Sequence, residues 1–178
     1  EADHGTAVVM DVKTGAIRAM ANLGRTSKGH YFEKRNYAIW ESTEPGSTFK
    51  LASVLALLDD GHADTSTKVN TGEGYLDIYG ARIYDSNHQG YGNISLSQAF
   101  AVSSNVGIVK LMQKHYSDNP SQFVDRLYTM GLHHKLELPI RGEGSPLIPT
   151  PGGEQWSGLS LPWMAFGYQV SFTPLQLL

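Results

Sequence analysis

The stretch EPGSTFK, residues 44–50, contains a serine and a lysine three positions apart. Pro45-Gly46 interrupts the chain just before Ser47, so Ser47 is predicted to lie at or near the N-terminus of a helix. Ser47 and Lys50 could then be a nucleophile and its base. They could equally be a helix cap and a charge that reaches solvent. The surrounding residues and the rest of the chain are needed to distinguish a catalytic pair from a helix cap with a solvent-exposed charge.

The predicted helix spans Ser47–Asp60, ends at Gly61 and carries apolar side chains on all sides, which predicts that it is buried. Lys50 is the only charged residue between Phe49 and Leu58. Burial and the positive end of the helix dipole would both lower its pKa, which suits a base. The i, i+3 spacing puts both side chains on one face, and the helix N-terminus offers N–H groups to an oxyanion. A serine N-cap with a lysine that extends to water remains open from this stretch alone.

A second polar turn, Ser103-Ser104-Asn105, lies between helices predicted over 95–102 and 105–116. A fold can place such a turn in a cleft, where a hydroxyl relays a proton and an amide two residues later binds a substrate amide. The alternative is again a helix N-cap, supplied by Ser104 or Asn105.

The remaining pattern mixes strands and helices. Two apolar runs, Thr6–Val12 and Ala16–Ala21, predict a β-hairpin with Gly15 at its turn. Residues 69–84 suggest further short strands, and 120–130 a helix that ends at Gly131. Residues 139–162 are rich in proline and glycine and predict a long irregular segment, after which Thr173-Pro174 predicts a helix start.

Composition limits the possible functions. The chain has 178 residues, enough for one domain with a core, and a net charge of −3, which does not favour nucleic acid or an anionic membrane. It contains no cysteine, which excludes disulfides and thiol catalysis, and no apolar run of the length a bilayer needs. The seven histidines show no ligand spacing, with His62 and His88 isolated, so we expect neither a metal site nor a cofactor.

Four stretches in order resemble the transpeptidase domain of class B penicillin-binding proteins, and most closely its division-associated subgroup. They read AVVMDVKTGAIRAMAN, EPGSTFKLASVLALLDDG, SLSQAFAVSSNVGIVKLM and AFGYQVSFTPLQLL. The resemblance implies an α+β fold of the penicillin-binding protein and serine β-lactamase type, an antiparallel sheet with helices. It also implies that residues 1–178 are the N-terminal part of one such domain, dominated by the helical subdomain and the first hairpin. Because the C-terminal strands with the catalytic Lys-Thr-Gly are missing from this part, we expect it to be catalytically incomplete on its own.

The resemblance implies a role for each matching residue. Ser47 would be the acylated nucleophile, its backbone N–H half of the oxyanion hole, and Lys50 its base. Ser103 would pass a proton to the leaving D-alanine. Asn105 would bind the substrate amide, and Thr48 and Ser104 would belong to the substrate site.

The implied function is that of a peptidoglycan D,D-transpeptidase, which cross-links the cell wall through an acyl-serine intermediate. Its partners would be stem peptides that end in D-Ala-D-Ala, β-lactam antibiotics, and cell-wall synthesis or division proteins. Its place would be the outer face of the bacterial cytoplasmic membrane, in the periplasm, anchored by a segment outside this sequence. A serine β-lactamase or a β-lactam sensor on the same fold are the alternatives. A β-lactamase is expected to carry an E-x-x-L-N loop, which the sequence lacks.

Two strings imitate catalytic motifs of the family. Lys13-Thr14-Gly15 falls at the predicted hairpin turn, whereas the family's Lys-Thr-Gly comes last, so we expect the catalytic one beyond Leu178. Ser117-Asp118-Asn119 precedes a proline and predicts a turn between helices. The family usually has glycine where Gln169 stands, which puts the local backbone there in question.

Overall fold

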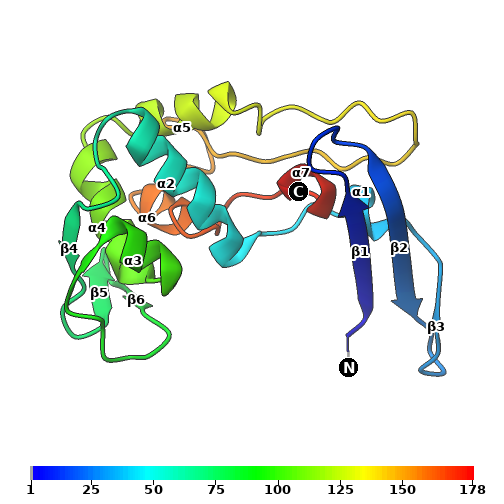
Figure 1. Cartoon of the computed structure of the whole chain (residues 1–178), viewed down its shortest axis with the longest axis horizontal. Coiled ribbons are helices and arrows are strands. Elements are labelled where there is room, and N and C mark those ends of the chain that lie inside the picture. The colour runs from blue at the N-terminus through cyan, green and yellow to red at the C-terminus, as the bar shows by residue number, and fades with distance from the viewer. Residues whose placement is uncertain (1) are drawn as a thin grey trace. The chain divides into compact units, whose positions relative to one another are not determined.

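The computed structural model describes residues 2–178, and its contacts group them into two compact units. One unit comprises the residues up to Thr43, Leu132–Leu147 and Ser171–Leu178. The other comprises Glu44–Gly131 and Ile148–Val170. Figure 1 labels the elements of both.

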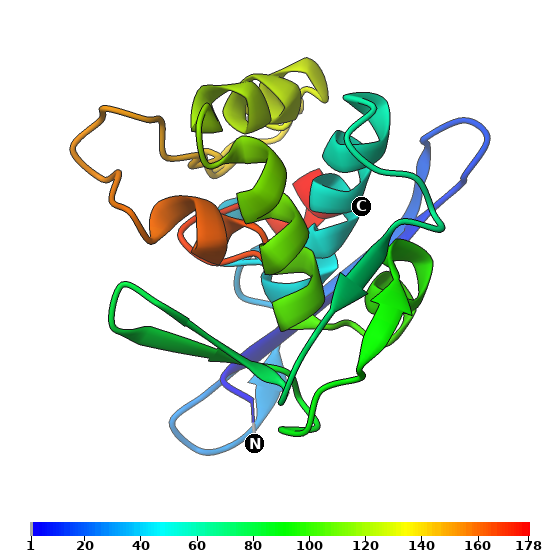
Figure 2. The ribbon, with the colours of Figure 1, turned by 90° about the vertical axis from the view of Figure 1, so that its left-hand side faces the viewer.

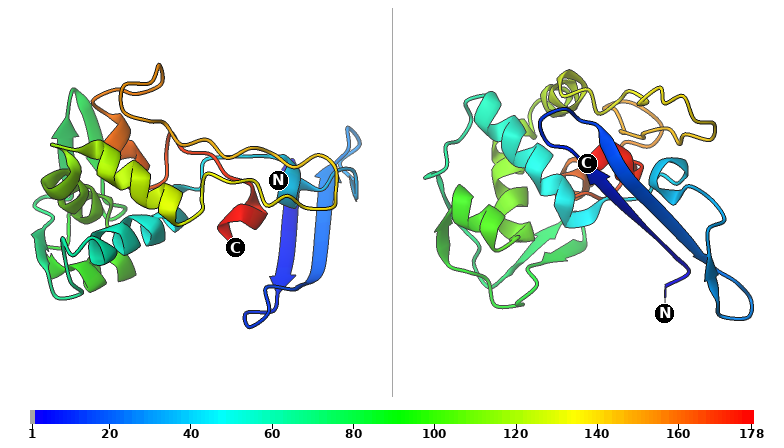
Figure 3. Two further views of the ribbon diagram at one scale, coloured as in Figure 1. Left: turned by 90° about the horizontal axis from the view of Figure 1, so that it is seen from above. Right: turned by 45° about the vertical axis from the view of Figure 1, so that its right-hand side comes forward.

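The first unit is built on the predicted hairpin, which is confirmed. Strands β1 (His4–Met10) and β2 (Ile17–Arg25) pair antiparallel, and the short β3 (Tyr31–Phe32) adds to β2. Figure 3 shows β1 and β2 as a long ribbon. Gly15 has a φ of 68° at the turn, which a side chain would disfavour.

Two short helices complete this unit. They are α1 (Tyr37–Trp40) and α7 (Pro174–Leu177). As predicted, Thr173 caps α7 with its side chain and Pro174 opens the helix. A small core joins both helices to one face of the hairpin; it consists of Ala38, Ile39 and Leu175 with Val8, Met10, Met20 and Leu138.

The second unit is mainly helical. Its helices are η1 (Gly46–Phe49, a 3₁₀ turn), α2 (Lys50–Asp59), α3 (Leu96–Ala101), α4 (Asn105–Tyr116), α5 (Pro120–Thr129) and α6 (Ser160–Met164). Helix α4 contacts α2, α3, α5 and α6, and Figure 2 shows it in the middle of this unit. The core around it includes Val54, Leu57, Val106, Ile108, Met112, Tyr116, Phe123, Leu127, Leu161 and Met164.

Four short strands complete this unit. β4 (Lys68–Asn70) pairs with β7 (Asn93–Ser95), and β5 (Tyr75–Ile78) pairs with β6 (Ala81–Tyr84), both antiparallel. The β5–β6 turn has positive φ at both Tyr79 and Gly80, as a tight two-residue hairpin requires. The predicted α+β class with antiparallel pairing is therefore confirmed.

Two expectations are corrected here. Helix α2 is not buried all round, because Leu51 and Leu55 are 52% and 45% exposed. These two residues are four positions apart and share the side of α2 that η1, α3, α4 and α5 leave uncovered. The proline- and glycine-rich segment 139–162 is also less irregular than predicted, because α6 begins within it at Ser160.

Candidate active site

The turn before Ser47 is held by a close backbone contact. The N–H of Gly46 donates to the carbonyl of Gly167 at 3.0 Å. A Cβ on Gly167 would lie only 2.0 Å from the carbonyl oxygen of Gly46, so no side chain fits at this position. Glycine at 167 therefore allows the segment after α6 to support the start of η1.

Lys50 does not extend to water. It is 1% exposed, and its Nζ donates to Ser47 Oγ at 3.1 Å, to Ser103 Oγ at 2.8 Å and to the Ser103 carbonyl at 2.7 Å. Ser47 itself is exposed. One lysine amine thus contacts both an accessible hydroxyl on η1 and the hydroxyl of Ser103, which lies 53 residues after Lys50 in the sequence. This geometry excludes a lysine that extends to solvent and is compatible with a nucleophile beside a base, whose catalytic roles remain a prediction.

Burial changes the acidity of this lysine. Removal from solvent lowers the pKa of Lys50 from 10.5 to about 8, and attraction to the Asp85 carboxylate partly opposes that shift. At pH 7 about a tenth of a lysine with this pKa is neutral, roughly 300 times the fraction for an ordinary lysine. Lys50 can therefore accept a proton from Ser47 near neutral pH.

Ser103 has an unusual backbone. Its φ is 55°, in the left-handed region that residues other than glycine seldom occupy. It lies between α3 and α4, and this conformation turns both of its oxygens toward the Lys50 amine. Strain of this kind persists where the surrounding structure imposes it, and it concentrates at functional sites.

The other residues expected in the site lie beside these. Thr48 is exposed and donates its hydroxyl to the Pro45 carbonyl at 2.9 Å. Asn105 donates its amide N–H to the Tyr84 carbonyl at 2.7 Å, while its Oδ1 has no hydrogen-bond partner among the described residues. This amide oxygen is buried in the structure, so its lack of a partner does not by itself make it accessible to a substrate. Substrate binding by Thr48 and Asn105 remains a prediction.

Ser104 is the N-cap of α4, which answers the question left open between Ser104 and Asn105. It is fully buried; its hydroxyl accepts from Gly107 N at 2.8 Å and donates to the Asp85 carboxylate at 2.9 Å. The substrate role predicted for Ser104 is untested, and in this structure its hydroxyl is already engaged within the protein.

The backbone question at Gln169 is also answered. Gln169 has a φ of 61°, so the position takes the conformation that glycine suits, and a larger residue adopts it here. The Glu44 carboxylate accepts from Gln169 N at 2.8 Å. The residue before Pro45-Gly46 thereby ties this strained backbone to the turn that carries Ser47.

The two imitation motifs lie in turns, as predicted. Lys13 and Thr14 donate their backbone N–H groups to the Asp11 carboxylate at the tip of the β1–β2 hairpin. Ser117 and Asn119 flank the connection between α4 and α5. Neither string belongs to the hydrogen-bonded group around Lys50.

The sequence analysis missed Asp85 and Glu44. Asp85 follows a short alternating strand and precedes the polar run Ser86-Asn87, a pattern that also fits an exposed turn. Nothing in that pattern reveals that its carboxylate is buried against Ser104, 19 residues later. The only sequence feature that points to Glu44 is its position directly before Pro45-Gly46, the turn that leads to Ser47.

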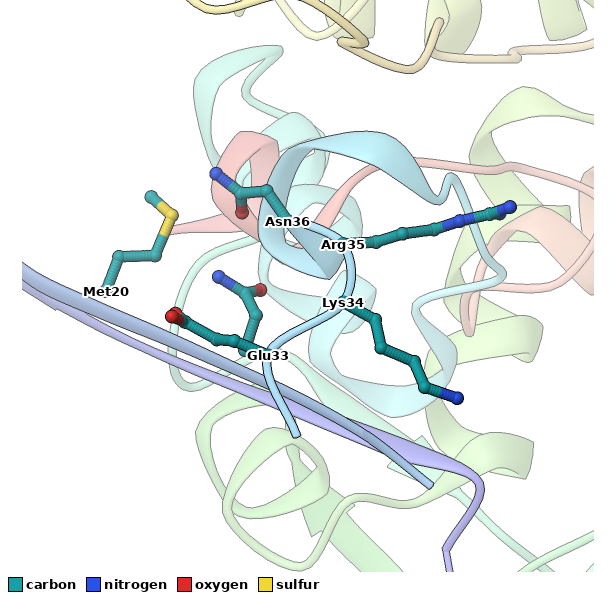
Figure 4. Close-up of a pocket in the computed structure, with 6 residues that line it drawn as sticks. Met20, Glu33, Lys34, Arg35 and Asn36 are labelled. Atoms are coloured by element: carbon teal, nitrogen blue, oxygen red, sulfur yellow. The ribbon is translucent and has the colours of Figure 1, made fainter. Parts of the chain in front are cut away.

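No group of three or more histidine and acidic side chains within residues 2–178 is placed to hold a metal ion. The sequence predicted that His62 is isolated, and the structure corrects this. Its ring stacks on that of His115, with centroids 5.0 Å apart. A cavity of about 370 Å³ lies in the unit built on the β1–β2 hairpin. It is lined by Met20, Asn22, Glu33, Lys34, Arg35 and Asn36, and Figure 4 shows how the side chains lie. It contains none of the expected site residues.

Among residues 2–178, no helix is both long and apolar enough to cross a bilayer.

Comparisons with known proteins show the family to which the chain belongs. Residues 5–178 match the family described as penicillin binding protein transpeptidase domain. The peptidoglycan D,D-transpeptidase FtsI of Escherichia coli K12 is 35% identical over 185 residues, which cover 99% of this chain and 29% of FtsI. The penicillin-binding protein PbpB of Mycobacterium tuberculosis H37Rv is 30% identical over 182 residues, covering 99% of this chain and 26% of PbpB.

Two solved structures are similar over nearly the whole chain. A peptidoglycan glycosyltransferase from Burkholderia ambifaria has a TM-score of 0.83 and 28% identity, covering 99% of this chain and 51% of that one. The TP domain of penicillin-binding protein 3 from Burkholderia pseudomallei has a TM-score of 0.78 and 25% identity, covering 98% and 47%. The chain thus spans less than a third of these curated relatives and about half of the solved chains.

Proposed function

Because this chain belongs to the penicillin-binding protein transpeptidase family, we propose that it carries the acylation site of a peptidoglycan D,D-transpeptidase. The observation that supports this most is the Lys50 amine, which donates to both Ser47 Oγ and Ser103 Oγ. A buried lysine with a lowered pKa between two serine hydroxyls can move a proton from one to the other.

In the proposed reaction, neutral Lys50 takes the proton of Ser47 while Ser47 Oγ attacks the carbonyl of the penultimate D-alanine of a stem peptide. The backbone N–H of Ser47 helps to stabilise the developing oxyanion. The peptide bond then breaks, and the proton passes from Lys50 through Ser103 Oγ to the amine of the departing D-alanine. An ester between Ser47 and the peptide remains. An amine of a second stem peptide attacks it and forms the new amide, the proton that this amine loses passes through Lys50 to Ser47 Oγ, and Ser47 is released as the free hydroxyl.

β-Lactams would acylate the same serine, since their strained amide also presents a carbonyl to Ser47 Oγ. The proposal includes the other parts of the expected role: work with cell-wall synthesis or division proteins, and a location on the outer face of the cytoplasmic membrane. The sensor and β-lactamase alternatives are not favoured, because the curated relatives are named transpeptidases or penicillin-binding proteins.

The test is made on a protein that contains this chain together with the Lys-Thr-Gly strand expected beyond Leu178. It uses a synthetic peptide that ends in D-Ala-D-Ala and measures release of D-alanine. We expect release that depends on an added amine acceptor and disappears in Ser47→Ala and Lys50→Met. Thr14→Ala, which alters the imitation motif at the hairpin tip, is the matched control and should leave the rate unchanged. Release that persists in Ser47→Ala would contradict the proposal.

A further inference from the structure

The carboxylate of Asp85 is buried against the turn that follows Ser103, and it has no role in the reaction proposed above. Asp85 follows β6 directly and is fully buried. One of its oxygens accepts from Ser104 Oγ at 2.9 Å and from Val106 N at 3.0 Å. The other lies 3.1 Å from Ser104 Oγ.

These contacts fix the turn that leads into α4. Ser104 and Val106 are both held by Asp85, and Asn105 between them donates to the carbonyl of Tyr84, the residue before Asp85. The last residue of β6 and the residue after it therefore bind the N-cap and the first two residues of α4. Ser103 is the next residue on the N-terminal side, so the same contacts stabilise its positive φ and the direction of its two oxygens toward Lys50.

Hydrogen bonding alone does not require a charge at this position. An asparagine oxygen could accept the same two hydrogen bonds, and an ionised carboxylate costs far more to bury than an amide. Such a charge is retained where it has a partner of opposite sign. Lys50 is that partner: both groups are buried, and the Asp85 carboxylate attracts the Lys50 ammonium.

We propose that Asp85 is a positioning residue for acyl transfer at Ser47, which holds the Ser103–Val106 turn by hydrogen bonds and stabilises protonated Lys50 by its negative charge. The proposal rests on the proposed function for its catalytic meaning. Its electrostatic part can be measured without any reaction. The groups that face the Lys50 amine are Ser47 from η1, Ser103 from the α3–α4 turn and, through its charge, Asp85 from the end of β6.

The direct test is the titration of Lys50 in protein labelled with ¹³C at lysine Cε, followed by NMR on the unreacted protein. Asp85→Asn keeps size and both acceptor contacts but removes the charge. We expect the pKa of Lys50 to fall below its value of about 8 in the parent protein. A fall of about one unit is the scale expected for losing an opposite charge nearby.

Asp77→Asn is the matched control. Asp77 is an exposed carboxylate on the same hairpin, bonded to Arg82, and its removal changes the net charge equally. It should leave the pKa of Lys50 unchanged. Asp85→Ser, which keeps an oxygen and also lacks the charge, replaces Asp85→Asn if that variant does not fold, with the same expected fall.

The second readout is the rate of β-lactam acylation against pH. In Asp85→Asn the acid limb of this profile should move to lower pH by the same amount as the NMR titration, and Asp77→Asn should follow the parent protein. A folded neutral variant with an unchanged Lys50 pKa would overturn the proposal and leave Asp85 a structural residue, however slow its acylation. Failure of the parent protein to be acylated would contradict the proposed function, while the titration would still decide the role of Asp85.

Discussion

The rate of Ser47 acylation should depend on pH through the protonation of Lys50. Burial lowers the pKa of this lysine to about 8. Only the neutral amine can accept the Ser47 proton, so the rate should rise with pH and level off above the pKa. The neutral fraction is about 1% at pH 6 and about 50% at pH 8, which predicts a roughly fifty-fold increase over that interval. An ordinary lysine would give a rate that still climbs tenfold per unit at pH 9.

The assay follows the intact mass of the protein over time after a β-lactam is added, at steps of half a pH unit from about 6 to 9.5. Ser47→Ala gives the background. Lys50→Arg keeps a positive charge at every pH in this range and should show no acylation limb, because the pKa of arginine lies above about 12. A rate that is flat between pH 6 and 8, or that still rises tenfold per unit above pH 9, would refute the assignment of Lys50 as the base.

Three substitutions test the supports of the site by urea unfolding. Gly167→Ala places a methyl group 2.0 Å from the Gly46 carbonyl oxygen and should destabilise the protein by about 2 kcal/mol more than Gly152→Ala, which has a similar φ but meets open space; equal losses would contradict the close contact. Gln169→Gly should stabilise by up to about 1 kcal/mol, because it relieves a positive φ, and a loss would show that the Gln169 side chain matters more than its strain. Ser104→Ala should cost about 1–3 kcal/mol, because it removes the α4 cap and leaves a buried carboxylate with one donor fewer; a cost below about 0.5 kcal/mol would contradict both roles.

Local signals in the sequence were sufficient for most elements near the site. Pro45-Gly46 and Gly61 bracketed the η1–α2 segment, because proline and glycine act through the backbone alone and need no distant partner. The cap at Thr173 was equally local. The Ser47 and Lys50 pair was visible for the same reason, since i, i+3 spacing fixes which side chains are neighbours once a helix forms.

Features that depend on distant contacts were not visible. Asp85 looked like a turn residue, and its burial arises from packing of β6 against the start of α4. The positive φ of Ser103 runs against the intrinsic preference of serine and is imposed by neighbours that no local pattern reveals. The exposure of Leu51 and Leu55 was also missed. An apolar residue type suggests burial, but the sequence does not show which side of the helix its neighbours leave uncovered.

The most direct test of the account is to identify the residue that a β-lactam modifies. A protein that contains this chain together with the Lys-Thr-Gly strand expected beyond Leu178 is incubated with the antibiotic, its intact mass is measured, and the modified peptide is mapped. The account predicts one antibiotic added per chain, attached at Ser47, and no addition in Ser47→Ala. No addition at saturating antibiotic, or an addition that remains in Ser47→Ala, would contradict the claim that Ser47 and Lys50 form the acylation site.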